Sequence, residues 1–513
     1  MFVPLTVGEF LARADFVYGE RVGVVDEPGR PGSLGEVSYA EIHRRARHMA
    51  ATLDGMGVEH GERVAIVSQN AARFLISFYG VSGFGRVLVP VNFRLNAEEV
   101  NYIVDHSGAS VLLVDPELDE ALAGVNAKER ILLDGTADAE LFVDAPADPR
   151  AWQPDESATA TINYTSGTTA RPKGVQLSHR TNYLNALSFG WHAGVSDRDV
   201  YLHTLPMFHA NGWGMPYACT AMGVKQVVLR KVDGEDILRR IDEHRVTLLC
   251  GAPAVVAAVL DAAAQRRERG EEVPGRDRVR MIVAGAPPPS KTIERVEAEL
   301  GWEFIQIYGL TETAPLLTMN RRREEWDGLD VAERARLLSR AGAPAVGVRV
   351  RVDENGEVLA RSNHVFDGYW NQPEATKEAI VDGWFHTGDG GALDGPYVVI
   401  ADRKKDVIIS GGENVSSIEV EDCLFQHPAV AECAVIGVPD EKWGETVKAL
   451  VVLREGQEVS ERDLIEHCRG RIAHYKCPTS VEFRYALART ATGKLQKFKL
   501  RAPYWEGRDR QVN

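Results

Sequence analysis

Short apolar runs alternate with longer amphipathic runs in the first part of the chain. Residues 63–70, 86–92 and 110–115 are rich in Val, Leu and Ile, which is typical of strands buried on both faces. Apolar side chains at helical spacing separate the first two runs, and Asn96 followed by Glu99 predicts a capping box before the third. Strands that alternate with helices predict parallel sheets, with functional sites at the carboxyl ends of the strands.

The same alternation returns between residues 225 and 289, and the pattern of predicted elements changes near residue 402. The chain then predicts two strands, a helix that begins with Ser460 and Asp463, a further strand and a short basic helix. The sequence therefore predicts a large α/β domain over residues 1–402 and a small α+β domain over residues 403–513, a usual domain size.

Composition and charge exclude several classes of protein. The 513 residues carry a formal charge of −15, which argues against nucleic-acid binding because phosphate backbones attract basic surfaces. No run of about 18 uncharged apolar residues predicts a membrane span. The first fifteen residues lack a basic n-region, and the six cysteines are scattered without metal-ligand spacing. We expect a cytoplasmic protein with reduced thiols.

The stretch YTSGTTARPKG, residues 164–174, concentrates hydroxyls, glycines and one lysine. The side chains that would bind a polyanion, and the glycine that lets the backbone approach it, are Thr165, Ser166, Gly167, Thr168, Thr169 and Lys173. The spacing is not that of a P-loop, because Gly174 stands where that motif requires a hydroxyl. A flexible surface turn is the alternative interpretation of this stretch by itself.

Two further stretches carry nucleotide-binding chemistry. In residues 305–313, Tyr308 and Gly309 end an apolar strand and are followed by Thr311 and Glu312, so that a ring could face a base and a carboxylate could hold Mg²⁺. Asp389 is expected in a tight glycine turn, where it could accept hydrogen bonds from ribose hydroxyls. Ordinary strand packing and an ordinary turn are the alternatives.

The remaining stretches lie at the predicted domain boundary and near the C-terminus. DRKKD at residues 402–406 places three cations at the boundary, and SGGEN at residues 410–414 follows with two glycines. Lys494 lies on a loop of Gly and Thr, where lysine supplies a compact charge on a flexible stem. A solvated basic surface is the alternative for this last loop.

Together and in this order, YTSGTTARPKG, YGLTE, TGD, DRKKD, SGGEN and TGK resemble the motifs of the adenylate-forming superfamily. That superfamily contains acyl-CoA synthetases, peptide-synthetase adenylation domains and firefly luciferases, and the resemblance extends over residues 36–503. It implies parallel sheets in αβαβα layers, a β-barrel-like subdomain and a small mobile C-terminal domain. It also implies a two-step reaction, in which ATP and an acid give an acyl-adenylate and a thiol then displaces AMP.

The resemblance implies a role for each motif residue. The loop from Thr165 to Lys173 would hold the β- and γ-phosphates, Thr311 would contact the α-phosphate, and Glu312 would bind Mg²⁺. Tyr308 with Gly309 and the turn Gly285-Ala286-Pro287 would flank adenine, while Asp389 and Arg403 would bind the ribose. Lys494 would bridge the acid and the α-phosphate. After adenylation, a swing about Lys405 would bring Gly411, Gly412 and Glu413 to the pantetheine tunnel.

Residues 205–217 resemble the acyl-pocket segment of medium- and long-chain fatty acyl-CoA synthetases, which are often homodimers. His209 is therefore a candidate catalytic and acyl-pocket residue, and Trp213 a candidate gate of the pocket; core packing is the alternative for both. We expect a hydrophobic acid, with ATP, Mg²⁺ and CoA as the other reactants. An acyl carrier protein is the alternative acceptor, and a non-catalytic nucleotide-binding scaffold is the alternative class.

Three departures from the family pattern lie outside the inferred catalytic side chains. Ala170 replaces a glycine, Ser417 replaces a frequent proline, and residues 348–362 form a shorter segment than usual. We expect them to affect the rate of turnover more than the type of reaction.

Overall fold

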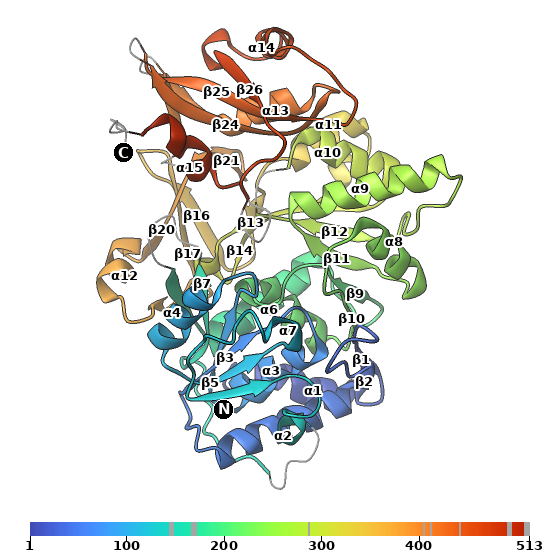
Figure 1. Ribbon diagram of the computed structural model, residues 1–513, viewed down its shortest axis with the longest axis vertical. Helices are drawn as coiled ribbons and strands as arrows, with labels where there is room; N and C mark the ends of the chain where they lie inside the picture. Colours follow the sequence, from blue (N-terminus) through green and yellow to red (C-terminus); the bar gives the residue numbers. More distant parts are fainter. Residues whose placement is uncertain are drawn as a thin grey trace.

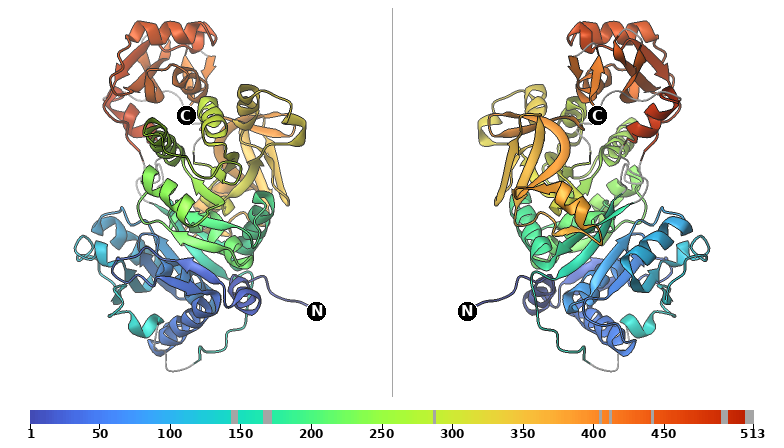
Figure 2. Two further views of the ribbon diagram at one scale, coloured as in Figure 1. Left: turned by 90° about the vertical axis from the view of Figure 1, so that its right-hand side faces the viewer. Right: turned by 90° about the vertical axis from the view of Figure 1, so that its left-hand side faces the viewer.

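A computed structural model of the chain describes residues 1–142, 148–165, 172–285, 288–403, 406–410, 413–440, 443–489 and 495–506. A large N-terminal part lies below a smaller C-terminal part, drawn in orange to red at the top of Figure 1, and Figure 2 shows the same arrangement from two sides. Among the described residues, no helix is long and apolar enough to cross a bilayer. All six cysteines are buried, and their thiols are free.

The first sheet has seven strands. Their order is β18 (Gly368–Tyr369), β8 (Lys173–Ser178), β7 (Thr159–Thr165), β4 (Val87–Val91), β3 (Arg63–Val67), β5 (Ala109–Val114) and β6 (Glu129–Leu132). The five strands from β7 to β6 run parallel, whereas β8 and β18 extend one edge in antiparallel orientation. The strands expected at residues 63–70, 86–92 and 110–115 are thus confirmed as β3, β4 and β5.

The second sheet has nine strands. Their order is β15 (Ala343–Pro344), β14 (Leu316–Asn320), β13 (Glu303–Gly309), β12 (Arg280–Val283), β11 (Leu248–Gly251), β9 (Val200–His203), β10 (Lys225–Val228), β1 (Val22–Val25) and β2 (Glu36–Ser38). The six strands from β13 to β1 are parallel, and the others are antiparallel. This confirms the alternation expected between residues 225 and 289.

Helices and sheets form five layers. The central core between the sheets contains α1 (Gly8–Tyr18), α2 (Tyr39–Gly55), α3 (Ala72–Val81), α5 (Ala139–Phe142), α6 (His179–Ala193) and α7 (Met215–Ala221). The outer face of the second sheet packs on α8 (Gly234–Glu243), α9 (Pro253–Glu268), α10 (Ser290–Arg295) and α11 (Val331–Leu338), and that of the first sheet on α4 (Ala97–Ser107). Side chains alternate to match: Val64 and Ile66 join the central core, whereas Ala65 and Val67 pack towards α4. The expected αβαβα layering is confirmed.

Two capping boxes fix helix starts where the sequence predicts them. Asn96 accepts a hydrogen bond from the backbone N–H of Glu99 at 3.0 Å, and the Glu99 carboxylate accepts one from Asn96 N–H at 3.0 Å. Ser460 and Asp463 form the same arrangement at α14 (Glu461–Arg469) in the C-terminal part. Each box satisfies backbone donors that a helix leaves unpaired at its first turn.

A third, antiparallel sheet completes the N-terminal part and corrects one prediction. It contains β16 (Val348–Val352), β17 (Glu357–Ser362), β20 (Trp384–Asp394) and β19 (Ile380–Val381), with β21 (Tyr397–Arg403) beside β20 and α12 (Pro373–Ala379) nearby. The tight turn expected at Asp389 is wrong, because Asp389 lies inside β20, which pairs on both sides. A Cβ at Gly391 would lie 2.7 Å from the carbonyl oxygen of Val399, so this glycine admits a close neighbouring strand.

The C-terminal part is a small α+β unit with its own core. Its strands are β23 (Glu413–Val415), β22 (Ile408–Ser410), β25 (Gly444–Leu453) and β24 (Val430–Asp440), with β26 (Ser480–Phe483) also paired to β25. Helices α13 (Ser417–Phe425) and α14 cover this sheet, and α15 (Lys497–Arg501) follows near the end of the described chain. The predicted fold class, a large α/β part followed by a smaller α+β part, is confirmed.

Candidate active site

The loop rich in hydroxyls begins and ends on two paired strands. Thr165 ends β7, Lys173 begins β8, and these two residues face each other in the antiparallel register. The Tyr102 hydroxyl donates a hydrogen bond to the Pro172 carbonyl at 3.2 Å and holds the far end of the loop. Ser166, Gly167, Thr168 and Thr169 lie outside the described residues. The structure therefore fixes where the loop starts and where its lysine stands.

Lys173, Tyr369 and Glu312 form a compact group beside this loop. The Lys173 ammonium lies 4.7 Å from the centre of the Tyr369 ring, and the Tyr369 hydroxyl donates to Glu312 Oε1 at 2.9 Å. Tyr369 reaches this place because β18 pairs with β8, which Lys173 begins. Burial, followed by the charge of Glu312, raises the pKa of Tyr369, so its hydroxyl keeps its proton and remains a donor at neutral pH.

A second polar pair lies where β13 meets the third sheet. The Tyr308 hydroxyl donates to Asp389 Oδ2 at 2.7 Å, and Asp389 is only 8% exposed. Gly309 follows on β13, and a Cβ there would lie 1.5 Å from the Pro315 carbonyl oxygen, so only glycine fits. Asp389 is also paired in register with Arg403 on β21. The two residues expected at the ribose thus occupy facing positions on adjacent strands.

The short turn that follows β13 carries Thr311 and Glu312. Thr311 begins a 3₁₀ turn, Thr311–Thr313, and the Thr313 hydroxyl donates to the Pro315 carbonyl at 2.6 Å. The backbone N–H of Leu310 in turn donates to the Thr313 hydroxyl at 2.9 Å. Thr313 therefore holds the turn in shape and leaves Thr311 and Glu312 partly exposed at the carboxyl end of the strand.

Gly285, expected beside adenine, follows β12 with a left-handed φ of 96°, a conformation that favours glycine. Ala286 and Pro287 lie outside the described residues. A few residues on, the backbone N–H of Ser290 donates to Asp422 Oδ1 of α13 at 3.0 Å. The C-terminal part therefore contacts the N-terminal part next to this turn.

The segment expected to bind the acid lies in the interior. His209 and Trp213 belong to a short turn, His209–Gly214, between β9 and α7, and Trp213 is 4% exposed within the central core. The ring of His209 lies against Phe208, with 6.3 Å between their centroids. Trp213 is therefore as buried as a core residue, which is the alternative interpretation for it, whereas His209 is partly exposed.

Most of the residues expected to act from the C-terminal part lie outside the described residues: Lys405, Gly411, Gly412 and Lys494. Glu413 is described, and it is exposed at the start of β23. Arg489 and Leu495, on either side of the Lys494 loop, form a β-bridge, and the Gln496 N–H donates to the Ala488 carbonyl at 2.8 Å. The two ends of that loop are therefore joined like the base of a hairpin.

The sequence did not identify Tyr369, Thr313 or Asn211 as site residues. Tyr369 stands in a two-residue strand whose partner lies in β8, far earlier in the chain, so no local pattern marks it. Thr313 directly follows Glu312. Threonine hydroxyls often bond to the backbone in turns, so this residue type was a signal that could have predicted its role. Asn211 lies in the apolar segment 205–217, and its hydrogen bonds go to distant elements, β7 and α6, which no local pattern shows.

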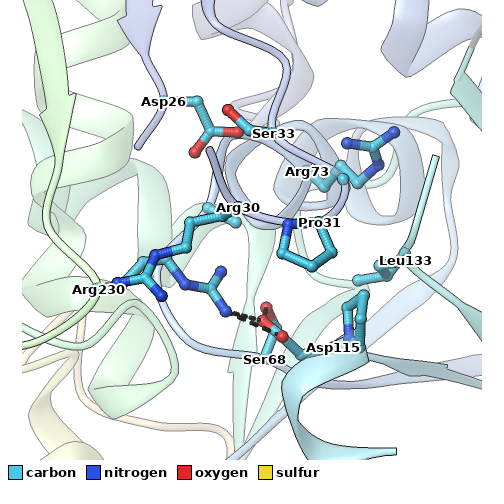
Figure 3. Close-up of a pocket in the computed structure, with 12 residues that line it drawn as sticks. Asp26, Arg30, Pro31, Ser33, Ser68, Arg73, Asp115, Leu133 and Arg230 are labelled. Carbon is cyan, nitrogen blue, oxygen red and sulfur yellow. Dashed lines mark hydrogen bonds and ion pairs between the residues drawn. The ribbon is translucent and has the colours of Figure 1, made fainter. Parts of the chain in front are cut away.

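A separate polar cavity in the N-terminal part is too small to be this site (Figure 3). Its volume is about 10 Å³, room for one water molecule. The Arg230 guanidinium donates to both carboxylate oxygens of Asp115 at 2.9 Å across its wall. Burial raises the pKa of Asp26, another lining residue, which accepts from the backbone N–H of Leu34 and Ala72. These contacts hold the elements around the cavity together.

The described geometry defines an ATP-dependent, adenylate-forming class of enzyme: a lysine at the base of a hydroxyl-rich loop, a carboxylate after β13, and a tyrosine bonded to the buried carboxylate of Asp389 at one edge of the sheets. One carboxylate with substrate phosphates is a usual Mg²⁺ environment, so Glu312 fits that ion.

Comparison with known proteins identifies the family. The family model of the AMP-binding enzymes matches residues 13–370, and that of the AMP-binding enzyme C-terminal domain matches residues 419–494. 4-Hydroxybutyrate–CoA ligase 2 of Metallosphaera sedula is 38% identical, over 96% of this chain and 93% of its own. 2-Methylpropanoate–CoA ligase of Humulus lupulus is also 38% identical, over 97% and 95%. The solved o-succinylbenzoate CoA synthetase of Bacillus subtilis, with ATP and magnesium, has a TM-score of 0.81 and 28% identity over 96% and 98%.

The chain therefore belongs to the AMP-binding enzyme family, and within it to the acyl-CoA synthetases. This confirms the expected superfamily. The comparisons do not single out the medium- and long-chain fatty acyl-CoA synthetases that the sequence suggested, because the names of these relatives specify 4-hydroxybutyrate, 2-methylpropanoate and o-succinylbenzoate.

Proposed function

We propose that the protein converts a short-chain, apolar carboxylic acid to its CoA thioester. In the first step the acid carboxylate attacks the α-phosphate of ATP, and pyrophosphate leaves. In the second step the CoA thiol attacks the acyl carbonyl, loses its proton, and AMP leaves. The observation that carries the proposal is the convergence of Lys173, Glu312 and the Tyr308–Asp389 pair at one edge of the sheets. A bound ATP needs a cation for its phosphates, a carboxylate for its Mg²⁺ and a hydrogen-bond acceptor for its ribose hydroxyls, and these residues supply all three.

The N-terminal residues divide the nucleotide between them. Thr165 and Lys173, with the loop that joins them, hold the β- and γ-phosphates, where a cation and N–H donors stabilise the charge that develops on oxygen. Glu312 holds Mg²⁺, which neutralises charge on the phosphate oxygens. Thr311 contacts the α-phosphate. Tyr308, with Gly309 and the turn Gly285-Ala286-Pro287, packs on adenine, and Asp389 and Arg403 bind the ribose.

The C-terminal part, residues 403–513, serves the two steps in turn. Lys494 orients the acid carboxylate against the α-phosphate in the first step, and Gly411, Gly412 and Glu413 line the path of the CoA thiol in the second, after rotation about Lys405. The β-bridge between Arg489 and Leu495 supports this assignment, because it joins the described residues on either side of Lys494. Lys494→Ala is expected to abolish acyl-adenylate formation and to preserve thioester formation from supplied acyl-adenylate. Equal loss of both half-reactions would contradict the alternation.

The acid is short and apolar. Residues 210–214 are buried in the central core, and apolar side chains surround them: Met207, Phe208, Met215 and Tyr217. Apolar surroundings of this kind favour an acid without a second charge, since an unpaired charge is costly to bury. The acids in the names of the two relatives, 4-hydroxybutyrate and 2-methylpropanoate, are short as well. His209, partly exposed at the start of the segment, faces the carboxylate end of the acid.

The setting of the reaction is the cytoplasm, and the six buried free thiols support a reducing compartment. CoA is the acceptor, as the names of both relatives state for those enzymes. An acyl carrier protein remains the second acceptor to be tested, and a homodimer is the assembly that we propose for measurement in solution.

The test supplies purified protein with ATP, Mg²⁺ and one acid at a time: acetate, butanoate, 2-methylpropanoate, 4-hydroxybutyrate, octanoate, palmitate or benzoate. Each reaction runs with and without CoA, and AMP and acyl products are followed by mass spectrometry. We expect acyl-CoA, dependent on CoA, from the short acids. Acyl-adenylate that accumulates and ignores CoA would move the acceptor to a carrier protein. AMP from no acid would contradict the proposal.

A further inference from the structure

Residues 210–214 adopt a left-handed backbone at five consecutive positions. The φ angles are 37° at Ala210, 49° at Asn211, 56° at Gly212, 58° at Trp213 and 76° at Gly214. Every residue except glycine is disfavoured in this conformation, and three of the five carry side chains. Strain of this kind persists only where the surrounding structure holds it, and it gathers at ligand sites.

Asn211 supplies the hydrogen bonds that hold the turn. Its side chain is buried, with 1% of the residue exposed. Its Nδ2 donates to the Thr161 hydroxyl oxygen at 3.0 Å and to Asn182 Oδ1 at 3.2 Å. Asparagine also tolerates the left-handed region better than most residues do. One residue therefore meets both requirements of the turn, the backbone conformation and the anchoring.

One partner of Asn211 lies on the strand that leads into the proposed phosphate loop, and the other lies on α6. Thr161 lies on β7, four residues before Thr165, where the phosphate-binding loop begins. Asn182 lies on α6 and donates to the Ser178 carbonyl at 3.1 Å. In Figure 1, β7, α6 and α7 meet at the centre of the molecule, below the third sheet.

The end of the turn is pressed against the same helix. A Cβ at Gly214 would lie 2.4 Å from Asn185 Nδ2 of α6, and the Asn185 Oδ1 accepts the backbone N–H of Leu316 on β14 at 3.1 Å. The left-handed turn is thus fixed at its middle by Asn211 and bounded at its end by α6. A shift of the turn would move Trp213, which lies between these two points.

We propose that Asn211 is the positioning residue of the acid-binding segment and that it couples acid selection, through Thr161, to the strand that carries the phosphate loop. It touches neither reactant itself and acts through Trp213 and His209. The proposal rests on the proposed function, which assigns residues 209–214 to the acid pocket.

The chain offers a closely matched control for the test. Asn320 on β14 is also 1% exposed, and its Nδ2 also donates two hydrogen bonds, to the carbonyls of Leu337 at 2.8 Å and Arg340 at 3.0 Å. Neither partner belongs to the acid segment. Asn211→Ala and Asn320→Ala therefore each remove two hydrogen bonds donated by an amide from equally buried sites, and only the first is expected to alter acid selection.

The assay measures kcat and KM for butanoate and octanoate at saturating ATP and CoA, together with urea unfolding. We expect Asn211→Ala to raise the butanoate KM about tenfold, because acid binding then has to order the segment that Asn211 held in place. We also expect it to change the ratio of kcat/KM between the two acids about threefold. Asn211→Gly, which keeps the left-handed backbone, raises the KM too, and so does Thr161→Val. Thr161→Ser, which keeps the hydroxyl, restores the wild-type values. The proposal would be overturned if Asn211→Ala and Asn320→Ala had the same ratio of kcat/KM between butanoate and octanoate. It would also be overturned if Thr161→Val had the wild-type KM for butanoate.

Hydrogen exchange gives a readout that does not depend on activity. In the Asn211→Ala protein we expect the amides of residues 208–216 to exchange faster than in the wild type, with no such change in Asn320→Ala. An unchanged rate there overturns the positioning role even if no acid of the series is a substrate. Failure of the wild type to form any adenylate contradicts the proposed function instead, so the two failures remain distinct.

Discussion

The Tyr308–Asp389 hydrogen bond gives a sharp test of nucleotide recognition. Tyr308→Phe keeps the ring that faces adenine and removes only the hydroxyl that donates to the buried Asp389 carboxylate at 2.7 Å. A hydrogen bond to a charged group contributes about 1.5–3 kcal/mol, and about 1.4 kcal/mol corresponds to a tenfold change in an equilibrium constant. We therefore expect the KM for ATP to rise roughly 10- to 100-fold, because Asp389 is no longer held where the ribose needs it.

Tyr397→Phe is the matched control for this substitution. Tyr397 is 7% exposed, more buried than the partly buried Tyr308, and its hydroxyl accepts a hydrogen bond from the Arg323 guanidinium at 2.9 Å. The assay follows pyrophosphate release against MgATP at saturating acid and CoA, with thermal unfolding of each variant alongside. Both variants are expected to lose stability, and only Tyr308→Phe to lose affinity for ATP. An ATP KM for Tyr308→Phe equal to that of Tyr397→Phe would refute this reasoning.

Three further outcomes are expected. Glu312→Gln should raise the Mg²⁺ concentration for half-maximal rate about tenfold or more, because a neutral amide binds Mg²⁺ weakly; an unchanged Mg²⁺ titration would exclude Glu312 as the ligand. Lys173→Ala should lower kcat/KM for ATP about 100-fold in pyrophosphate release, since the cation faces the phosphates, and an unchanged value would remove it from the site. Burial lowers the pKa of His179, His203 and His364 to about 4. A lowered histidine pKa gives stability that is present above the unfolded value of about 6.5 and lost as the pH falls towards 4. At pH 5 each of these histidines lowers the free energy of unfolding by about 2 kcal/mol relative to pH 7.5. Urea unfolding at the two pH values measures this loss, and equal free energies of unfolding would contradict it.

The sequence predicted those elements whose signals are local. Strands β3, β4 and β5 stand where continuous apolar runs lie, because strands buried on both faces need apolar side chains at every position. The capping box at Asn96 likewise depends on residues three apart. Tyr308, Glu312 and Asp389 were identified by their motifs, and the structure adds what pairs with them.

Contacts between distant segments were beyond such patterns. The GDGG stretch around Asp389 has the local composition of a turn, yet pairing with β17 and β21 on both sides makes it a strand. Tyr369 joins the site through β18, whose partner residues in β8 lie almost two hundred positions earlier. The left-handed run around Asn211 depends on hydrogen bonds to β7 and α6, so the segment 205–217 alone predicts only that it is apolar.

The contact between the two parts of the molecule is compatible with the proposed rotation of the C-terminal part between the two steps. The hydrogen bond from Ser290 N–H to Asp422 joins α10 to α13 beside the turn that contains Gly285. The Ser290 hydroxyl also donates to the same carboxylate oxygen at 3.4 Å. A hydrogen bond to a carboxylate contributes about 1.5–3 kcal/mol, which thermal motion breaks on the timescale of domain rotation. A large apolar interface here would hold the C-terminal part in one orientation, and one of the two proposed steps would then lack its residues.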